Sequence, residues 1–177
     1  MYQSQELYPE LTVVQDNWEV IRDDSLKLLD QGCYSEMPNN GFSVERQNNP
    51  QVWYYCPFGL EAEDQTPQTR VQTAYAQSLA PRTVEILAQV KGLKGAMFSL
   101  LKPGGQIKEH THENSYVTAT MGLQVDAKCT FRVCDETRSH ENGEFLVFDY
   151  CLPHEAWNTG DRDRMVLLLV LQNKLAL

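Results

Sequence analysis

Three of the four histidines lie in two short motifs whose spacing suits metal binding. His110 and His112 are two residues apart, so in a β-strand both side chains point to the same face. His154 comes directly after Pro153 and follows the apolar segment 145–149, at the expected start of another strand. An imidazole from each of two neighbouring strands is the geometry that binds a divalent metal and leaves one side open. The structural alternative is a surface pair at His110 and His112 with a capped core histidine at His154.

Arg164 stands at the start of the very apolar segment 165–171. A cation at the mouth of a buried strand costs free energy unless it meets an anion. Two partners are open: an aspartate or glutamate of this chain, or the carboxylate of a ligand held bidentately by the guanidinium. Since Arg164 follows His154 by ten residues, we expect it on the strand next to the histidine motif.

The first half of the chain predicts helices and loops. Residues 18–29 indicate an amphipathic helix that lies against a sheet, with Asp16 and Asn17 as its cap and Gly32 at its stop. Its apolar face is expected to hold Trp18, Ile21, Leu26 and Leu29. Two further helices are expected, a weak one over 69–79 and a stronger one over 81–90, where Pro81 suits the first turn.

Between the first helix and the next, residues 34–69 are rich in Asn, Pro, Gln and Gly. They predict two irregular loops around a short strand near Trp53. A long loop in a compact domain tends to be functional, so this region is the expected place of substrate recognition.

After Gly95 the hydrophobic pattern changes from helical to alternating, which indicates a β-sandwich or barrel with the helices packed outside it. We expect one domain over 1–177, with a helical and loop part over 1–94 and a β core over 95–177. The expected strands, separated by turn signals, cover residues 96–101, 106–110, 116–125, 129–133, 144–149, 155–158 and 165–171.

The composition narrows the classes of molecule that we expect the protein to bind. A formal net charge of −9 and a pI near 4.9 argue against nucleic acid or an anionic membrane surface as the main partner. No stretch reads as a targeting signal or a membrane span, so we expect a cytoplasmic protein. The five cysteines are scattered without a paired motif, which favours reduced thiols.

Together these residues resemble the aspartyl/asparaginyl β-hydroxylase family of Fe(II)- and 2-oxoglutarate-dependent oxygenases. The resemblance covers most of the chain, and it implies a double-stranded β-helix, a cupin-like jelly roll that is mainly β with flanking helices. Its most specific motifs are Phe98-Ser99 with Pro103-Gly104, His110-Thr111, Met121-Gly122-Leu123, Asp135-Glu136-Thr137-Arg138, Phe148-Asp149, and His154-Glu155-Ala156-Trp157 with Arg164.

The resemblance also implies roles for individual residues. His110 and His154 match the two iron-binding histidines of the family, Arg164 the arginine that binds the distal carboxylate of 2-oxoglutarate, and Ser99 a hydroxyl at the same end. The expected cofactor is Fe(II), with 2-oxoglutarate and dioxygen as cosubstrates. The expected reaction is hydroxylation of a free amino acid or of a peptide or protein residue, at its β carbon.

This chain departs from the animal members of the family at three positions. His112 replaces a glycine there, and an aspartate in the common facial triad. Two roles are open for it: a third imidazole ligand, since the strand geometry aims it at the metal, or a residue that only supports the ligands or points outward. Thr118 and Thr120 stand where those enzymes carry an arginine for the acidic substrate and a histidine for the cofactor. We expect Thr120 to bind the proximal carboxylate, and Thr118 to contact the substrate without the cation that an aspartyl group would need. Further expected substrate contacts are Trp53, Tyr54, Arg46 and Arg70.

Two other readings fit parts of the same pattern. His110, His112 and His154 also resemble the metal motifs of a small three-histidine cupin that acts without 2-oxoglutarate. The usual glutamate of that motif is missing, because Tyr116 and Val117 occupy its place. The remaining alternative is a metal-free binding module that uses the jelly-roll pocket.

Overall fold

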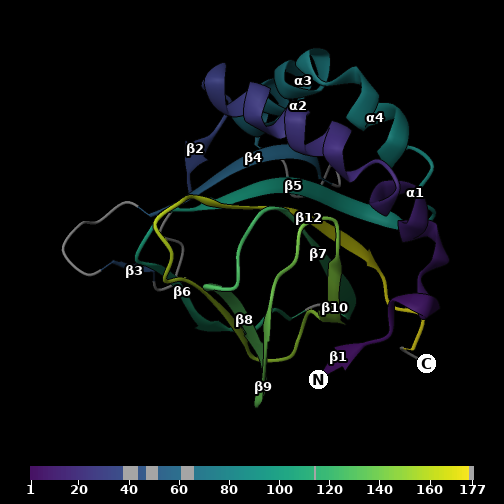
Figure 1. Cartoon of the computed structure of the whole chain (residues 1–177). Helices are drawn as coiled ribbons and strands as arrows, with labels where there is room; N and C mark the ends of the chain where they lie inside the picture. Colours follow the sequence, from purple (N-terminus) through teal and green to yellow (C-terminus); the bar gives the residue numbers. More distant parts are fainter. Residues whose placement is uncertain (38–43, 47–51, 61–65, 114, 176–177) are drawn as a thin grey trace.

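The computed structural model describes residues 1–37, 44–46, 52–60, 66–113 and 115–175, and in them two β-sheets face each other under a layer of helices (Figure 1). The helices are the 3₁₀ turns η1 (Gln5–Leu7) and η2 (Pro9–Leu11), α1 (Thr12–Gln15), α2 (Trp18–Asp30), α3 (Pro67–Leu79) and α4 (Pro81–Leu87). The strands are β1 (Tyr2–Gln3), β2 (Ser35–Glu36), β3 (Val44–Arg46), β4 (Trp53–Leu60), β5 (Leu93–Leu101), β6 (Gly105–His110), β7 (Tyr116–Gln124), β8 (Cys129–Val133), β9 (Glu136–Ser139), β10 (Phe145–Asp149), β11 (His154–Asn158) and β12 (Arg164–Gln172).

The larger sheet has seven strands in the order β1-β10-β7-β12-β5-β4-β2, and the smaller has five in the order β3-β6-β11-β8-β9. Every pairing within the two sheets is antiparallel. This two-sheet arrangement with helices outside confirms the predicted mainly β, jelly-roll class. It places β12 at the centre of the larger sheet, where both of its neighbours are also buried.

Successive side chains along the central strands point to opposite faces of the larger sheet, so they lie in two different environments. In β12, Met165, Leu167 and Leu169 pack into the core beneath the helices, whereas Arg164, Val166 and Leu168 point between the sheets. The paired residues on neighbouring strands share that inner face: Ser99 of β5 lies opposite Val166, and Thr120 of β7 lies opposite Leu168. The apolar run of β12 is therefore buried on both faces, and its polar first residue belongs to the inner one.

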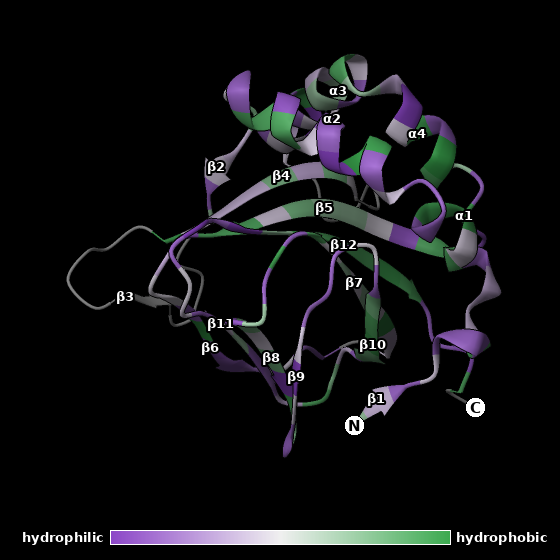
Figure 2. Ribbon diagram, in the orientation of Figure 1, coloured by the Kyte–Doolittle hydropathy of each residue, from purple (hydrophilic) through white to green (hydrophobic). Residues whose placement is uncertain are grey.

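Helix α2 covers the outer face of the larger sheet, as predicted (Figure 1). Its buried positions are Ile21, Ser25 and Leu28, so the face differs from the expected one at Leu26, which is 39% exposed. The buried Ser25 hydroxyl lies 2.7 Å from the Tyr34 hydroxyl, which satisfies both groups. Figure 2 shows hydrophobic and hydrophilic residues alternating along the helices, and their buried residues, such as Ile21, Ala76 and Ile86, belong to the core beneath them.

The residues expected to begin and end α2 behave differently: the one at its start does not cap the helix, and the one at its end does stop it. Asn17 occupies the N-cap position, but its side chain donates backwards to the carbonyl of Val13 at 2.8 Å and does not cap α2. At the other end Gly32 has a φ of 70°, a left-handed conformation that glycine adopts without strain, and it stops the helix as expected.

Sequence patterns located most elements to within a few residues. The short strands β1, β2, β3 and β9 were not expected, because two to four residues carry too little periodicity to recognise. Of these, β1 and β3 extend the two sheets from residues 1–94, the part predicted as helices, loops and one strand. None of the described helices has the length and apolar character needed to cross a membrane, and the five cysteines are unpaired.

Candidate metal and carboxylate site

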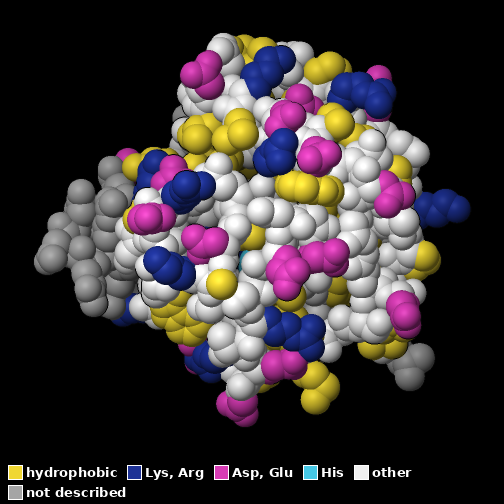
Figure 3. Space-filling view, viewed as in Figure 1, with side chains coloured by type: hydrophobic (Ala, Val, Ile, Leu, Met, Phe, Trp, Pro, Cys, Tyr) yellow, Lys and Arg dark blue, Asp and Glu magenta, His cyan; other side chains and the backbone are white. Residues whose placement is uncertain are grey.

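A cavity of about 210 Å³ lies between the two sheets and brings together most of the predicted site residues. Its walls are largely apolar, and a few polar groups converge in it. The lining comprises Met37, Trp53, Met97, Ser99, Ile107, His110, His112, Thr118, Thr120, Phe131, Phe148, Tyr150, His154, Glu155, Ala156, Arg164, Val166 and Leu168. On the face shown in Figure 3 only a small patch of histidine surface is visible; His110 and His112 are partly exposed, and His154 is buried.

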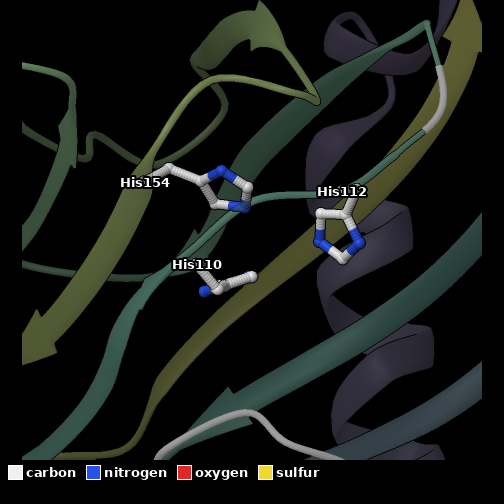
Figure 4. A group of neighbouring side chains, drawn as sticks. All are labelled: His110, His112 and His154. Atoms are coloured by element: carbon white, nitrogen blue, oxygen red, sulfur yellow. The ribbon is translucent and has the colours of Figure 1, made fainter.

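The three predicted metal ligands converge in this cavity (Figure 4). His110 ends β6 and His154 begins β11, and the two residues face each other across these paired strands. His112 follows the end of β6 and turns back toward them. One ring nitrogen from each of the three residues can be chosen so that all lie within 4.8 Å of one another. The spacing matches that of ligands around a single divalent ion.

Backbone contacts fix the orientation of two of the rings. Nδ1 of His110 lies 2.7 Å from the carbonyl oxygen of Lys108, and Nδ1 of His154 lies 2.7 Å from that of Leu152. A carbonyl only accepts, so each Nδ1 carries the proton and the lone pair resides on Nε2. This tautomer binds a metal through Nε2, and a backbone carbonyl behind the ring is the usual support of such a ligand.

Burial keeps the three imidazoles neutral. It lowers the pKa of His110, lowers that of His112 to about 4 and lowers that of His154 to about 3, with smaller contributions from the neighbouring imidazoles at His112 and His154. Metal ligands must be deprotonated, so these shifts leave the histidines ready for a cation near neutral pH.

His112 is held by an aromatic neighbour that the sequence did not single out. The ring of Tyr150 stacks on it with centroids 3.6 Å apart and an interplanar angle of 9°. Tyr150 follows β10, directly after the Phe148-Asp149 motif. Because the stack fixes the plane of His112 beside His110 and His154, it supports the predicted third ligand and argues against a side chain turned to solvent.

Arg164 is buried in the same cavity. It is 2% exposed, and among the described residues its Nε has no hydrogen-bond partner and no carboxylate lies within ion-pair distance of it. Burial lowers its pKa to about 10, which still leaves it charged at neutral pH. Of the two partners considered for Arg164, the described part of the chain does not supply the internal carboxylate. The guanidinium therefore fits an anionic ligand.

The acidic residue in the cavity lining given above, Glu155, already has partners. Glu155 is 7% exposed, but its carboxylate pairs with Arg132 and accepts a hydrogen bond from Gln106 at 3.2 Å. It neutralises a cation of its own sheet, so it does not offset Arg164. The cavity thus carries a net positive charge on its polar side.

Hydroxyl groups complete the polar part of the cavity. The indole Nε1 of Trp53 donates to Ser99 Oγ at 2.8 Å, and Thr120 Oγ1 lies 2.9 Å from Nε2 of His140. Thr118 Oγ1 is buried and finds no hydrogen-bond partner in the part of the chain that the structure describes. An unpaired buried hydroxyl costs free energy, so Thr118 also fits a ligand atom in the cavity.

Other predicted substrate contacts lie elsewhere. Tyr54 is next to Trp53 in β4 and therefore points to the opposite face, toward the helical layer. Arg70 is exposed on α3 and does not line the cavity. Arg46 lies in β3 opposite Gly105, but the position of its side chain is outside the described part of the structure.

His140 is, after Tyr150, a second site-associated residue that the sequence did not single out. It is the histidine outside the two metal motifs, and it follows β9 directly. In the fold it lies behind the cavity wall in contact with both Thr120 and Arg164. Only the fact that it was an unassigned histidine near a recognised motif could have drawn attention to it.

The fold and the site define a jelly-roll protein with three converging histidines and a buried arginine in one cavity. Within this class the chain belongs to the aspartyl/asparaginyl β-hydroxylase family, whose family model, described as "Aspartyl/Asparaginyl beta-hydroxylase", matches residues 15–174. The resemblance noted from the sequence is therefore confirmed.

Individual relatives are distant. The aspartyl/asparaginyl beta-hydroxylase of Mus musculus is 25% identical over 160 residues, which are 86% of this chain and 20% of that protein. The ornithine lipid ester-linked acyl 2-hydroxylase of Rhizobium tropici is 23% identical over 170 residues, 92% of this chain and 57% of that protein. The chain thus spans between a fifth and just over half of these relatives.

Among solved structures, a prolyl-4-hydroxylase of Pseudomonas putida superposes with a TM-score of 0.55 at 16% identity, covering 90% of this chain and 87% of that chain. At this identity the likeness shows the fold alone, and that fold agrees with the predicted jelly roll.

Proposed function

We propose that the protein is an Fe(II)- and 2-oxoglutarate-dependent hydroxylase. His110, His154 and His112 would hold the iron, and Arg164 with Ser99 would bind the distal carboxylate of 2-oxoglutarate. The overall reaction consumes 2-oxoglutarate, dioxygen and a substrate C–H group, and yields succinate, carbon dioxide and the hydroxylated product.

A single observation carries the proposal. Arg164 is a fully buried cation without a carboxylate from the described residues, and it lines the same cavity as three neutral imidazoles. A cupin that acts without a dicarboxylate gives such an arginine no role, whereas a ligand that binds a metal at one end and presents a carboxylate at the other uses both features.

When bound, iron and 2-oxoglutarate would activate dioxygen as the oxidant, and the protein supplies position and a dry environment. The carbonyls behind His110 and His154 orient the ligand nitrogens, so the metal position is set before it binds. The apolar residues between the sheets, Ile107, Phe131, Phe148 and Val166 among them, exclude water from the cavity. These residues favour reaction at a positioned carbon over release of oxidant into solvent.

For the substrate we propose an amino acid or a peptide or protein residue hydroxylated at its β carbon, as the family suggests. Thr118 places an uncharged hydroxyl in the cavity, which suits a neutral group better than a second carboxylate. A second candidate is an acyl chain, favoured by the apolar lining and by the name of the Rhizobium relative. For the location we keep the cytoplasm as a proposal.

The experiment that tests this proposal measures succinate formed from 2-oxoglutarate by the purified protein with Fe(II), ascorbate and dioxygen. It is run without added substrate, then with a panel of amino acids, peptides and acylated amines. We expect succinate to depend on Fe(II) and to rise with the true substrate, with one hydroxylated product per succinate. Absence of 2-oxoglutarate binding and turnover with an intact metal site would instead support the three-histidine cupin.

A further inference from the structure

His140 is a completely buried imidazole that the proposed chemistry does not use. Its side chain is 2% exposed and lies edge-on to Phe131, with ring centroids 5.9 Å apart. Its two nitrogens contact two different lining residues: Nε2 is 2.9 Å from Thr120 Oγ1, and Nδ1 is 3.4 Å from an Nη of Arg164. One ring therefore connects the arginine to a hydroxyl of the cavity wall.

The chemistry of these contacts determines where the imidazole proton sits. A guanidinium only donates, so Nδ1 accepts and carries no proton. Nε2 also lies 3.3 Å from the backbone carbonyl of Thr120, a group that only accepts, which places a proton on Nε2. Burial, and next the charge of Arg164, lower the pKa of His140 far below its ordinary value, in agreement with a neutral ring.

This tautomer sets the direction of the Thr120 hydroxyl. Because Nε2–H donates to Thr120 Oγ1, the hydroxyl hydrogen must point elsewhere. Within the protein it can reach the carbonyl of Leu146 at 3.5 Å, which is long for an O–H···O hydrogen bond. Thr120 lines the cavity, so its hydrogen is available to a ligand there.

Ser99 is arranged in the same way. The Trp53 indole, which only donates, occupies an acceptor position of the Ser99 hydroxyl, so the Ser99 hydrogen can point into the cavity that Ser99 lines. Arg164, Ser99 and Thr120 can consequently all present donors to the cavity, and the described acceptors that compete with a ligand lie at long hydrogen-bond distances: His140 Nδ1 lies 3.4 Å from Arg164, and the Leu146 carbonyl lies 3.5 Å from Thr120 Oγ1. A cradle made only of donors fits a carboxylate, which only accepts.

We propose that His140 is a positioning residue for the cosubstrate: it holds Arg164 and turns the Thr120 hydroxyl into a donor to the distal carboxylate of 2-oxoglutarate. This inference rests on the proposed function, and it places Thr120 at the Arg164 end of the ligand and not at the proximal carboxylate expected from the sequence. His140 itself touches neither metal nor ligand and acts only through these two side chains.

The test compares His140→Phe with His140→Gln in the Fe(II)-loaded protein without dioxygen. Phenylalanine keeps a ring beside Phe131 but removes both hydrogen bonds, whereas glutamine retains one donor and one acceptor on a side chain of similar reach. Calorimetry gives Kd for 2-oxoglutarate, and displacement gives Kd for 2-oxopentanoate, a five-carbon 2-oxo acid that lacks the distal carboxylate.

We expect His140→Phe to weaken 2-oxoglutarate binding about tenfold, the value of one lost hydrogen bond to a charged ligand, and to change 2-oxopentanoate binding by less than about twofold. His140→Gln should restore most of the loss. A residue needed only for folding would instead weaken both ligands together, and that outcome would overturn the proposal.

A double-mutant cycle with Thr120→Val tests the path through Thr120. If His140 acts through this hydroxyl, the two substitutions together should weaken binding clearly less than the product of their separate effects. If the double variant loses as much affinity as the two separate losses multiplied together, the path through Thr120 is refuted. If the wild-type protein binds no 2-oxoglutarate, the proposed function fails and this inference with it; if wild type binds and His140→Phe binds equally well, only this inference fails.

Discussion

Replacing Arg164 with methionine separates the cost of a buried cation from its use in binding a ligand. The guanidinium is 2% exposed, and none of the described carboxylates neutralises it. We expect the free energy of unfolding of the metal-free protein to stay unchanged or to rise by up to about 3 kcal/mol, because an unpaired buried charge is removed. An arginine in an internal ion pair behaves in the opposite way, since breaking such a pair destabilises by about 3–5 kcal/mol.

Arg164→Met should weaken 2-oxoglutarate binding far more than it changes the free energy of unfolding. Removing one partner of a buried charged pair costs about 2–5 kcal/mol, or about thirtyfold to several thousandfold in affinity. Because Arg164 is almost fully buried and no described cation is close enough to replace it, we expect a loss of at least about a hundredfold for 2-oxoglutarate. Arg164→Lys keeps a charge but loses the two-pronged geometry and should fall between wild type and Arg164→Met.

The assay combines denaturant unfolding of the metal-free protein with calorimetric titration of 2-oxoglutarate into the metal-loaded protein. Arg138→Met is the matched control, because Arg138 is an exposed arginine paired with Glu136 and does not line the cavity. It should leave the affinity within about twofold of wild type, as expected for a surface position. Unchanged 2-oxoglutarate affinity in Arg164→Met, or a loss of several kcal/mol in stability, would refute the assignment of this arginine.

Three further predictions concern the metal, the backbone and pH. His112→Gly should weaken Fe(II) affinity by more than about tenfold if this imidazole is a ligand, and an unchanged titration would exclude it. Gly122→Ala should destabilise by about 1–3 kcal/mol in thermal unfolding, since a Cβ there would collide with the carbonyl of Glu141, and a wild-type melting temperature would contradict that packing. Stability of the metal-free protein should fall as pH drops below about 6.5, because the unfolded chain binds protons that buried histidines exclude. His140→Gln should reduce that slope by up to about 1.4 kcal/mol per pH unit, and equal slopes would mean that His140 is protonated when folded.

Much of the fold was accessible from the sequence because hydrophobic periodicity is strong in long elements. The unbroken apolar run in residues 165–171 identified β12, and Arg164 directly before it identified a cation that had to face something buried. The short strands at the sheet edges were missed because their pairing partners, not their own residues, decide their structure.

The candidate site was accessible where function depends on residue type and spacing in the chain. His110 and His154 could be paired because His110 ends one predicted strand and His154 stands at the start of another. His140 and Tyr150 could not, because their importance comes from contacts with residues 20 or more positions away. Tyr54 was expected beside Trp53 in the cavity, and only the strand geometry sends it to the other face.

The two faces of β12 contact different parts of the molecule. Met165, Leu167 and Leu169 anchor the helical layer, whereas Val166 and Leu168 line the cavity where a substrate would sit. Variation at the second set can alter which molecule is accepted while leaving the packing of the first intact. Substitutions on the cavity face of β12 can therefore change substrate preference with little effect on thermal stability. Protein engineers can vary neighbouring positions of this strand for separate purposes.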